Sequence, residues 1–372
     1  MTAPVCLVAC ALLGIVGCTA ADNDARTTTS NGSSDAHKKC EPSGEIQYVC
    51  GPINAEDILQ IGDTEWLVTS GMSGFQGPPT VGALYLVNHV TRTYQKWFPG
   101  PNPILRPDRK MFADCPGPVD LATFVAHGLD LQRQDTNRYR LYVTSHGPRE
   151  SVEVFDVETA HSPPTIAWVG CVPFSARAPA NGVAILQDGG FMVTNTLDPS
   201  TPNGFAEMVT GKITGRVYEW HPRHEVVAVE GTDLSGPNGI AISADGRSLY
   251  VTASGSRKVI RYGLQSRPLR EESSVTLAIL PDDLHWSKTG TLYTAGRNYV
   301  PPTECAGATC ETGWSIFEIN ANTLEARRIA GADLTDALQG ASGAIAVGNN
   351  IWIGTYAGDR VGYVPLHSRI SR

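Results

Sequence analysis

Residues 235–254 read SGPNGIAISADGRSLYVTAS. Two short runs of alternating apolar residues, 240–242 and 249–252, flank an Ala-Asp-Gly turn at 244–246, and this pattern predicts a β-hairpin. The dipeptide Asn238-Gly239 is also a strong turn signal, but apolar alternation lies on only one side of it. Because residues 244–246 already supply the turn, Asn238 stands at the start of the first strand with a free carboxamide.

The same unit recurs along the chain. ANGVAILQDGGFMVTNT from residue 180 and PDDLHWSKTGTLYTAG from residue 281 also place a polar residue eight positions before a glycine, and looser copies begin at residues 55, 126 and 341. The polar residues that lead the six copies lie 71, 54, 57, 44 and 60 residues apart: Glu56, His127, Asn181, Asn238, Asp282 and Ser342. This period fits a four-stranded blade with its loops, so the sequence predicts an all-β, six-bladed β-propeller.

The composition agrees with many short strands joined by tight turns. The 372 residues include 38 glycines and 25 prolines, and only 18% are charged. The net charge of -8 and the absence of any Lys or Arg run argue against a nucleic-acid partner. No protein partner is evident from the sequence.

The N-terminal segment predicts export. Residues 1–18, MTAPVCLVACALLGIVGC, are apolar but too short to span a bilayer, as in a secretory signal peptide. IVGC at 15–18 resembles the lipobox of bacterial lipoproteins, in which Cys18 would be lipidated and tether the protein to a membrane; ordinary cleavage near Ala20 or Ala21 is the alternative. We therefore expect a periplasmic or cell-surface lipoprotein or a secreted protein, with residues 19–40 as a flexible linker and 41–368 as the propeller.

Export changes how the cysteines are interpreted. The six cysteines outside the signal form an even set in an oxidising compartment, which predicts disulfides: Cys40, Cys50, Cys115, Cys171, Cys305 and Cys310. The spacing of CAGATC suits a local bridge between Cys305 and Cys310, and Cys115 could pair with Cys171 across blades. The sequence leaves the pairing open.

A propeller would place the leading polar residues around one shared channel, because the innermost strand of every blade runs along the central axis. Carboxylate and carboxamide oxygens would then meet without a thiol, and calcium prefers such oxygen ligands. The predicted ligands are Glu56, Asn181, Asn238, Asp282 and Asp283. The alternative is that these side chains only cap the starts of their strands by hydrogen bonds to the backbone.

With these residues the chain resembles the paraoxonase and lactonase group of calcium-dependent six-bladed propellers, which has gluconolactonase-like and strictosidine synthase-like relatives. The resemblance covers residues 45–366 and rests on AEDI, AHGLDL, LYVTSHGPRESVEVF, ANGVAI, GPNGIAISADGRSLYV and LPDDLHW. It implies that the five residues above hold the calcium, although Asp283 stands where the paraoxonase pattern has Asn. It also implies a second calcium on Asp57 and the Leu129 carbonyl, for which Gly182 lacks the third ligand.

The resemblance further implies a histidine dyad. His127 leads its copy of the repeat and His146 ends the following strand, at the positions of a proposed catalytic pair in the paraoxonases. His221, His224 and His285 are interpreted as structural or exposed. The connection 197–215, with a short helix expected near 205–209, would overhang the calcium and shape the substrate pocket.

Together these features predict a calcium-dependent hydrolase of small lactones or aryl esters. Calcium would polarise the carbonyl and His127, helped by His146, would take the proton from the attacking water. The absence of a G-x-S-x-G elbow argues against a serine esterase. One alternative is a strictosidine synthase-like enzyme, which uses a catalytic Glu without metal chemistry. Another is a propeller that only binds a carbohydrate or protein.

Overall fold

The computed structural model describes residues 40–72, 82–175, 177–301, 312–332 and 338–366. The predicted signal peptide, Cys18, most of the linker and the Cys305–Cys310 pair lie outside these ranges, so those expectations stay predictions. Cys40–Arg372 forms one compact unit. Within the described ranges, no helix is long and apolar enough to cross a membrane.

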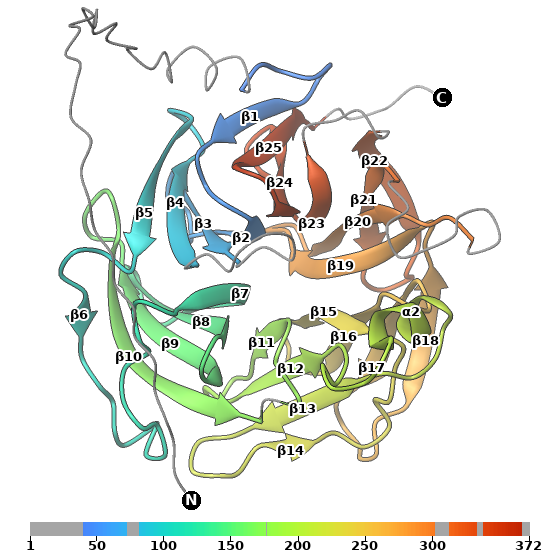
Figure 1. Cartoon of the computed structure of the whole chain (residues 1–372), viewed down its shortest axis with the longest axis horizontal. Coiled ribbons are helices and arrows are strands. Elements are labelled where there is room, and N and C mark those ends of the chain that lie inside the picture. The colour runs from blue at the N-terminus through green and yellow to red at the C-terminus, as the bar shows by residue number, and fades with distance from the viewer. Residues whose placement is uncertain (1–39, 73–81, 176, 302–311, 333–337, 367–372) are drawn as a thin grey trace, which may run out of the picture. The chain divides into compact units, whose positions relative to one another are not determined.

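The predicted propeller is confirmed: six sheets surround one central axis like blades (Figure 1). From the axis outward, the first blade contains β2 (Ala55–Gln60), β3 (Trp66–Gly71), β4 (Ala83–Asn88) and β5 (Thr93–Phe98). The second contains β7 (Val125–Arg133), β8 (Arg138–His146), β9 (Glu150–Glu158), β10 (Thr165–Phe174) and β6 (Ile104–Leu105). The third contains β11 (Val183–Ile185), β12 (Phe191–Asn195), β13 (Arg216–Trp220) and β14 (Val227–Ala228).

The remaining blades close the ring. The fourth contains β15 (Pro237–Ile242), β16 (Ser248–Ala253), β17 (Lys258–Gly263) and β18 (Glu271–Thr276). The fifth contains β19 (Ile279–Trp286), β20 (Thr291–Asn298), β21 (Trp314–Asn320) and β22 (Ala326–Ala332). The sixth contains β23 (Gln339–Val347), β24 (Asn350–Ala357), β25 (Arg360–Pro365) and β1 (Gln47–Cys50). Because β1 pairs with β25, the first strand of the propeller completes the last blade and closes the ring.

Apolar runs form the middle strands because each blade is covered on both faces by its neighbours. All six residues of β4, ALYLVN, are buried, as is typical of strands without a solvent face. The largest apolar cluster joins the first three blades and includes Leu86, Phe155 and Phe191. Burial between blades therefore stabilises the ring as one unit.

Two disulfides are present in the described residues, Cys40–Cys50 and Cys115–Cys171. The second pairing is one that the sequence left open, but it does not cross between blades. Cys115 lies in the segment before β7 and Cys171 lies on β10, so the bridge ties that segment to the second blade. Disulfides of this kind are typical of extracellular and periplasmic proteins.

The inner strands carry a β-bulge where the sequence repeat has its leading polar residue. In β2, β7, β15, β19 and β23, two consecutive residues oppose one residue of the neighbouring strand. The bulged pairs are Glu56-Asp57, His127-Gly128, Asn238-Gly239, Asp282-Asp283 and Ser342-Gly343. Bulges change the direction of side chains and interrupt the regular alternation. The Asn-Gly dipeptide therefore serves as a bulge and not as a turn.

Glycine follows the polar residue because the inner strands approach one another closely. A Cβ atom on Gly239 would lie 2.5 Å from the Asp282 carbonyl oxygen, and one on Gly128 would lie 2.3 Å from the Asn181 carbonyl oxygen. Separations below 3.0 Å require the backbone to move. The repeat therefore needs glycine where two inner strands meet at these bulges.

Hydroxyl groups of the preceding blade hold the backbone at the start of four inner strands. Thr144 donates a hydrogen bond to the Asn181 carbonyl oxygen at 2.7 Å, and Thr252 donates one to the Asp282 carbonyl oxygen at 2.7 Å. The same arrangement joins Thr194 to Asn238 and Ser342 to Glu56. Four of the predicted ligands thus have their backbone carbonyls held by a hydroxyl group, which makes the channel wall rigid.

Candidate active site

The bulges bring acidic side chains from the first and fifth blades together in the channel. Ligand atoms of Glu56, Asp282 and Asp283 lie within 4.8 Å of one another. Asn238 of the fourth blade hydrogen bonds to the Asp282 side chain. Glu56 and Asp283 are each only 1% exposed, so water does not screen their mutual repulsion.

Four buried oxygen atoms at this place have no hydrogen-bond partner among the described residues: Glu56 Oε2, Asn181 Oδ1, Asn238 Oδ1 and Asp283 Oδ2. An unpaired buried acceptor costs free energy, and strand capping would have paired these oxygens with backbone N–H groups. Four unpaired acceptors at the inner edges of four different blades therefore fit a bound cation better than they fit capping. We name Glu56, Asn181, Asn238, Asp282 and Asp283 the oxygen ring.

The electrostatics of the oxygen ring also fit a cation. Burial raises the pKa of Asp282 to about 8, and the neighbouring Glu56 carboxylate adds to this effect. Burial and the nearby carboxylates likewise raise the pKa values of Glu56 and Asp283 well above normal. A divalent ion removes the repulsion that causes these shifts, and the ligand set of carboxylate and amide oxygens is one that suits calcium.

Both carboxylate oxygens of Asp57 have hydrogen-bond partners in the protein. Its Oδ2 accepts the Leu129 backbone N–H at 2.6 Å, and its Oδ1 lies 2.5 Å from His285 Nε2. At Gly182, a Cβ atom would lie 2.7 Å from the Asn238 carbonyl oxygen, so close strand packing explains why no aspartate stands there. The ligand set that the resemblance implies for a second calcium is therefore incomplete.

His285 is an unexpected part of the channel. Ligand atoms of Asp57, Asp283 and His285 lie within 4.8 Å of one another. Burial alone would lower the pKa of His285, but the carboxylates of Asp57 and Asp130 outweigh burial and raise it. His285 thus lies among the carboxylates and can offset their negative charge.

His127 and His146 lie together, as the resemblance implied. Nδ1 of His127 is 2.8 Å from Nε2 of His146, and Nε2 of His127 is 3.5 Å from Glu56 Oε1. The His127 residue is 7% exposed, and burial lowers its pKa. A neutral imidazole beside the oxygen ring can accept a proton from a group bound there.

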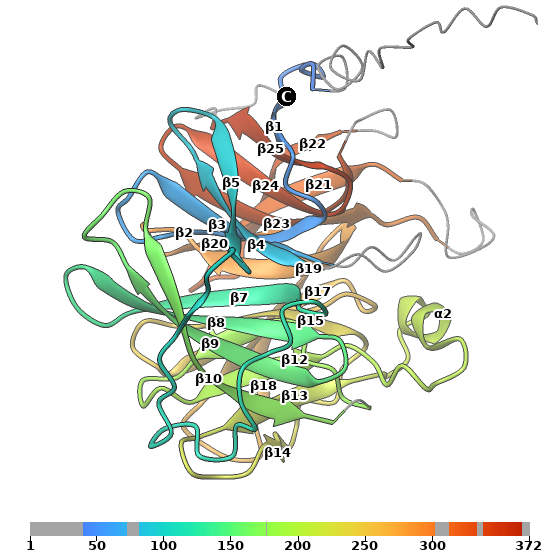
Figure 2. The ribbon, with the colours of Figure 1, turned by 60° about the vertical axis from the view of Figure 1, so that its left-hand side comes forward.

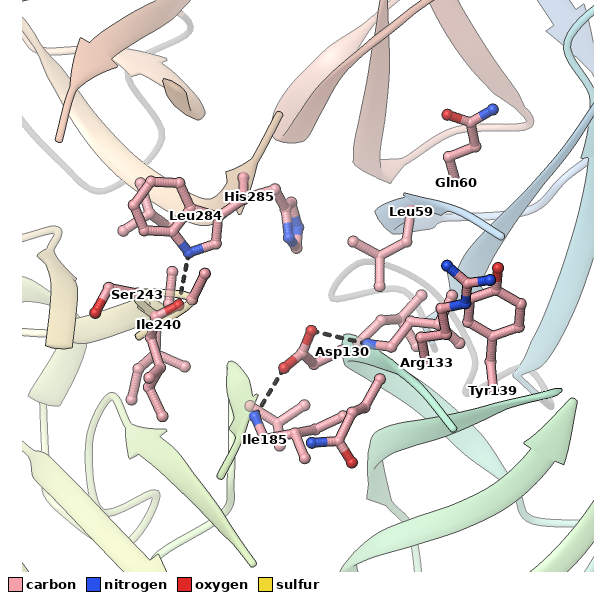
Figure 3. Close-up of a pocket in the computed structure, with 18 of the residues that line it drawn as sticks. Leu59, Gln60, Asp130, Arg133, Tyr139, Ile185, Ile240, Ser243, Leu284 and His285 are labelled. Atoms are coloured by element: carbon pink, nitrogen blue, oxygen red, sulfur yellow. Dashed lines mark hydrogen bonds between the residues drawn. The ribbon is translucent and has the colours of Figure 1, made fainter. Parts of the chain in front are cut away.

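A cavity of about 750 Å³ opens at the opposite end of the channel. It is lined by the later residues of the inner strands, such as Leu59, Leu131 and Ile185, whereas His127 lies near the start of its strand. Figure 3 shows the Asp130 carboxylate in this cavity, where it accepts N–H groups of Leu131 at 2.8 Å and Ile185 at 2.7 Å. This cavity and the histidine pair therefore lie at opposite ends of the channel.

The connection before β13 contains the expected short helix, α2 (Gly204–Val209). Figure 2 shows α2 standing outside the blades, close to the fourth one in Figure 1. Ser235, just before β15, donates a hydrogen bond to the Met208 carbonyl oxygen at 2.9 Å. This contact attaches α2 to the segment that leads directly to Asn238.

Sequence reasoning missed the hydroxyl groups, His285 and Glu150. The recurring dipeptide Val-Thr in LYVTS, FMVTN and LYVTA marks the three threonines that hold the next blade. His285 follows the acidic pair by two positions, which places it on the same inner strand. Glu150, whose Oε2 lies 2.7 Å from His146 Nδ1, could not be identified from the sequence, because this contact depends on the shape of the turn between β8 and β9.

Comparison with known proteins gives one partial match in sequence. The sequence profile of the strictosidine synthase family matches residues 199–267, a segment that includes β13 to β17 and Asn238. No curated protein sequence matches the chain.

Solved structures share the fold at low identity. A luciferin-regenerating enzyme has a TM-score of 0.52 and 12% identity, over 86% of this chain and 94% of its own. A protein assigned to the gluconolactonases has a TM-score of 0.51 and 15% identity, over 88% and 95%. A gluconolactonase from Xanthomonas campestris has a TM-score of 0.50 and 16% identity, over 87% and 89%. These similarities confirm the six-bladed fold, which gluconolactonase-like proteins share.

Proposed function

We propose that this protein is an exported, calcium-dependent hydrolase of small lactones or aryl esters. One observation supports the proposal more than any other: four unpaired buried oxygens lie around the channel beside a pair of hydrogen-bonded histidines. A strand-capping role would leave no reason for either the unpaired acceptors or the adjacent imidazoles.

Glu56, Asn181, Asn238, Asp282 and Asp283 would hold the calcium. When bound, calcium supplies a Lewis acid that polarises a carbonyl group and stabilises the negative charge that develops on its oxygen. The chain contributes the rigidity of this site, since hydroxyl groups fix four of the five backbone positions. The bulges and their glycines hold the inner strands close enough for the oxygens to share one ion.

The histidine pair would perform the proton transfer. His127 lies beside the oxygen ring, is nearly buried, and has a lowered pKa, so it is neutral at physiological pH and can take the proton of an attacking water. His146 stands behind it at 2.8 Å and can stabilise the protonated form. General-base help of this kind contributes about 10² to 10⁴ in rate.

A panel of chromogenic lactones and aryl esters tests this function. We expect turnover that disappears when a chelator removes the metal and returns when calcium is added. His127→Gln should lose turnover while it keeps calcium, and His224→Gln, in an exposed turn between β13 and β14, serves as a matched control. Hydrolysis that persists in the metal-free protein would refute the role of calcium.

A second candidate is a condensing enzyme like strictosidine synthase, which the match to residues 199–267 favours. Such an enzyme would catalyse a condensation and would not need the metal for its chemistry. Formation of a condensation product by the chelated protein, with no ester hydrolysis in any condition, would favour this candidate.

The proposed cellular location of the protein rests on its N-terminal sequence and its disulfides. The two disulfides fit an extracellular or periplasmic location. Attachment to a membrane through a lipidated Cys18 is part of the proposal. Mass spectrometry of the mature N-terminus, purified from an exporting host, would detect the lipid or its absence.

A further inference from the structure

A third side chain continues the histidine pair away from the channel. Oε2 of Glu150 lies 2.7 Å from Nδ1 of His146, and Nε2 of His146 lies 2.8 Å from Nδ1 of His127. The outer nitrogen of His127, Nε2, then lies 3.5 Å from Glu56 Oε1 of the oxygen ring. Glu150, His146, His127 and Glu56 therefore form one continuous line of polar atoms across the second and first blades.

The chemistry of these groups determines where the protons are. An ionised carboxylate can only accept a hydrogen bond, so a neutral His146 must carry its proton on Nδ1 to meet Glu150. Nε2 of His146 is then an acceptor, and His127 must donate from its own Nδ1. The proton of neutral His127 is thereby placed on Nδ1, and its Nε2 keeps a free lone pair on the side of the oxygen ring.

We propose that Glu150 is a positioning residue for the histidine pair, which fixes the tautomers of His146 and His127 so that His127 Nε2 faces the oxygen ring as a proton acceptor. The catalytic part of this inference rests on the proposed hydrolase function. The tautomer part does not, because it follows from the hydrogen bonds that two neutral imidazoles make with an ionised carboxylate.

The surroundings keep Glu150 available for His146. The neighbouring Arg149 would be its natural ion-pair partner, but Arg149 instead bonds to Glu153 at 2.6 Å and to the Gly117 carbonyl oxygen at 3.1 Å. Glu153 is fully buried and also accepts hydrogen bonds from Ser151 and Trp168, both at 2.7 Å. This network fixes the arginine away from Glu150.

The turn between β8 and β9 has a shape that brings the two side chains together. Gly147 has a φ of 133°, a conformation that disfavours other residues, and a Cβ there would lie 2.7 Å from the Thr123 carbonyl oxygen. The side chains of His146 and Glu150 are 25% and 15% exposed, so the contact is partly shielded from water. An ion pair fully exposed to water would hold the two side chains in place only weakly.

The first test measures tautomers without any substrate. Nitrogen-detected NMR of the calcium-loaded protein, with ¹⁵N-labelled histidine, should show His146 and His127 both protonated on Nδ1. In Glu150→Ala the two rings should show mixed tautomers, whereas Glu150→Gln, whose amide oxygen can still accept, should resemble the wild type. Wild-type rings protonated on Nε2, or an unchanged pattern in Glu150→Ala, would overturn the proposal.

The second test measures catalysis with the same variants. Glu150→Ala should lower kcat by about 10- to 100-fold with KM unchanged, as removal of a residue that orients an active group typically does. Glu150→Gln should restore most of the turnover, and Glu158→Ala, at the other end of β9, should behave as wild type. Calcium affinity and Tm should be the same in all three. A parallel loss of Tm or calcium affinity in Glu150→Ala, or kcat within twofold of wild type, would overturn the positioning role.

The two tests separate the possible failures. If wild type hydrolyses no ester or lactone but shows the expected tautomers, the proposed function is wrong and the structural role of Glu150 stands. If wild type is active and the tautomers do not depend on Glu150, the positioning role is wrong and the hydrolase proposal is unaffected.

Discussion

Without the metal, the protein should become less stable as pH rises. Acidic residues with lowered pKa values have the opposite effect, because they make a protein more stable as pH rises. In the metal-free protein the pKa of Asp282 is about 8, against a usual value of 3.8. The folded state therefore binds a proton between these pH values that the unfolded state has already released. By linkage, the free energy of unfolding must fall as pH rises from 3.8 to about 8.

The size of the effect follows from the same shift. One proton of difference corresponds to about 1.4 kcal/mol per pH unit, so Asp282 alone removes about 3 kcal/mol between pH 5 and pH 7. With an unfolding entropy of about 2.1 cal/mol/K per residue, this equals a fall in Tm of about 4 °C for a unit of this size. Glu56 and Asp283 shift in the same direction, so the measured fall should be at least this large.

Differential scanning calorimetry between pH 5 and pH 8 tests this expectation, with and without calcium. The chelated protein should lose Tm as pH rises, while added calcium should stabilise the protein more at higher pH because it binds deprotonated ligands. Asp282→Asn should make the fall in Tm of the chelated protein less steep, whereas Asp245→Asn, in an exposed turn, should not. Identical profiles with and without calcium would refute the electrostatic account of the oxygen ring.

Four other outcomes are expected. Asn238→Ala should weaken calcium binding by about tenfold or more in isothermal titration with little change in the Tm of the chelated protein, and a loss of Tm without a loss of affinity would restore the capping interpretation. His127→Gln should reduce turnover by about 10²-fold. Because burial lowers the pKa of His127, the turnover of the wild type should fall with acidification only below the usual pKa of 6.5. This acid-side fall in turnover should be absent from the variant. Gly239→Ala should destabilise the fold by about 2 kcal/mol in urea unfolding, since its Cβ would lie 2.5 Å from the Asp282 carbonyl oxygen; an unchanged midpoint would contradict the close approach. Thr252→Val should cost about 1 to 2 kcal/mol in the same assay because it leaves that carbonyl oxygen without its 2.7 Å hydrogen bond, and a neutral result would show that the hydroxyl does not fix the blade.

The repeat made the fold predictable because one physical requirement recurs in every blade. Each inner strand needs apolar residues for burial between blades and a tight turn to the next strand. The polar residue at the start of the strand and the glycine of the turn are therefore separated by eight residues, as Asn238 and Gly246 are. The position of the polar residue at the start of the strand was therefore predictable too. The bulge at this residue was not predictable, since the same Asn-Gly sequence can form either a hairpin turn or a bulge.

Features that depend on contacts between blades could not be derived from the sequence. The resemblance implied Asp57 as a metal ligand, but it did not indicate the contact of Asp57 with His285, which lies 228 residues away in the chain. Glu150 is adjacent to an arginine, and only the three-dimensional network shows that the arginine bonds elsewhere. In both cases the partner of a charged side chain depends on packing, which the linear pattern does not encode.

Equilibrium dialysis with radioactive calcium tests the central claim most directly, because it counts ions without assuming any activity. We expect the chelated wild-type protein to take up one tightly bound ion per chain. Glu56→Gln, which keeps the shape of the side chain but removes its charge, should bind much more weakly, while Glu158→Gln should bind as wild type does. Failure of the wild-type protein to bind calcium, or equal binding by Glu56→Gln and wild type, would contradict the assignment of the oxygen ring as a cation site.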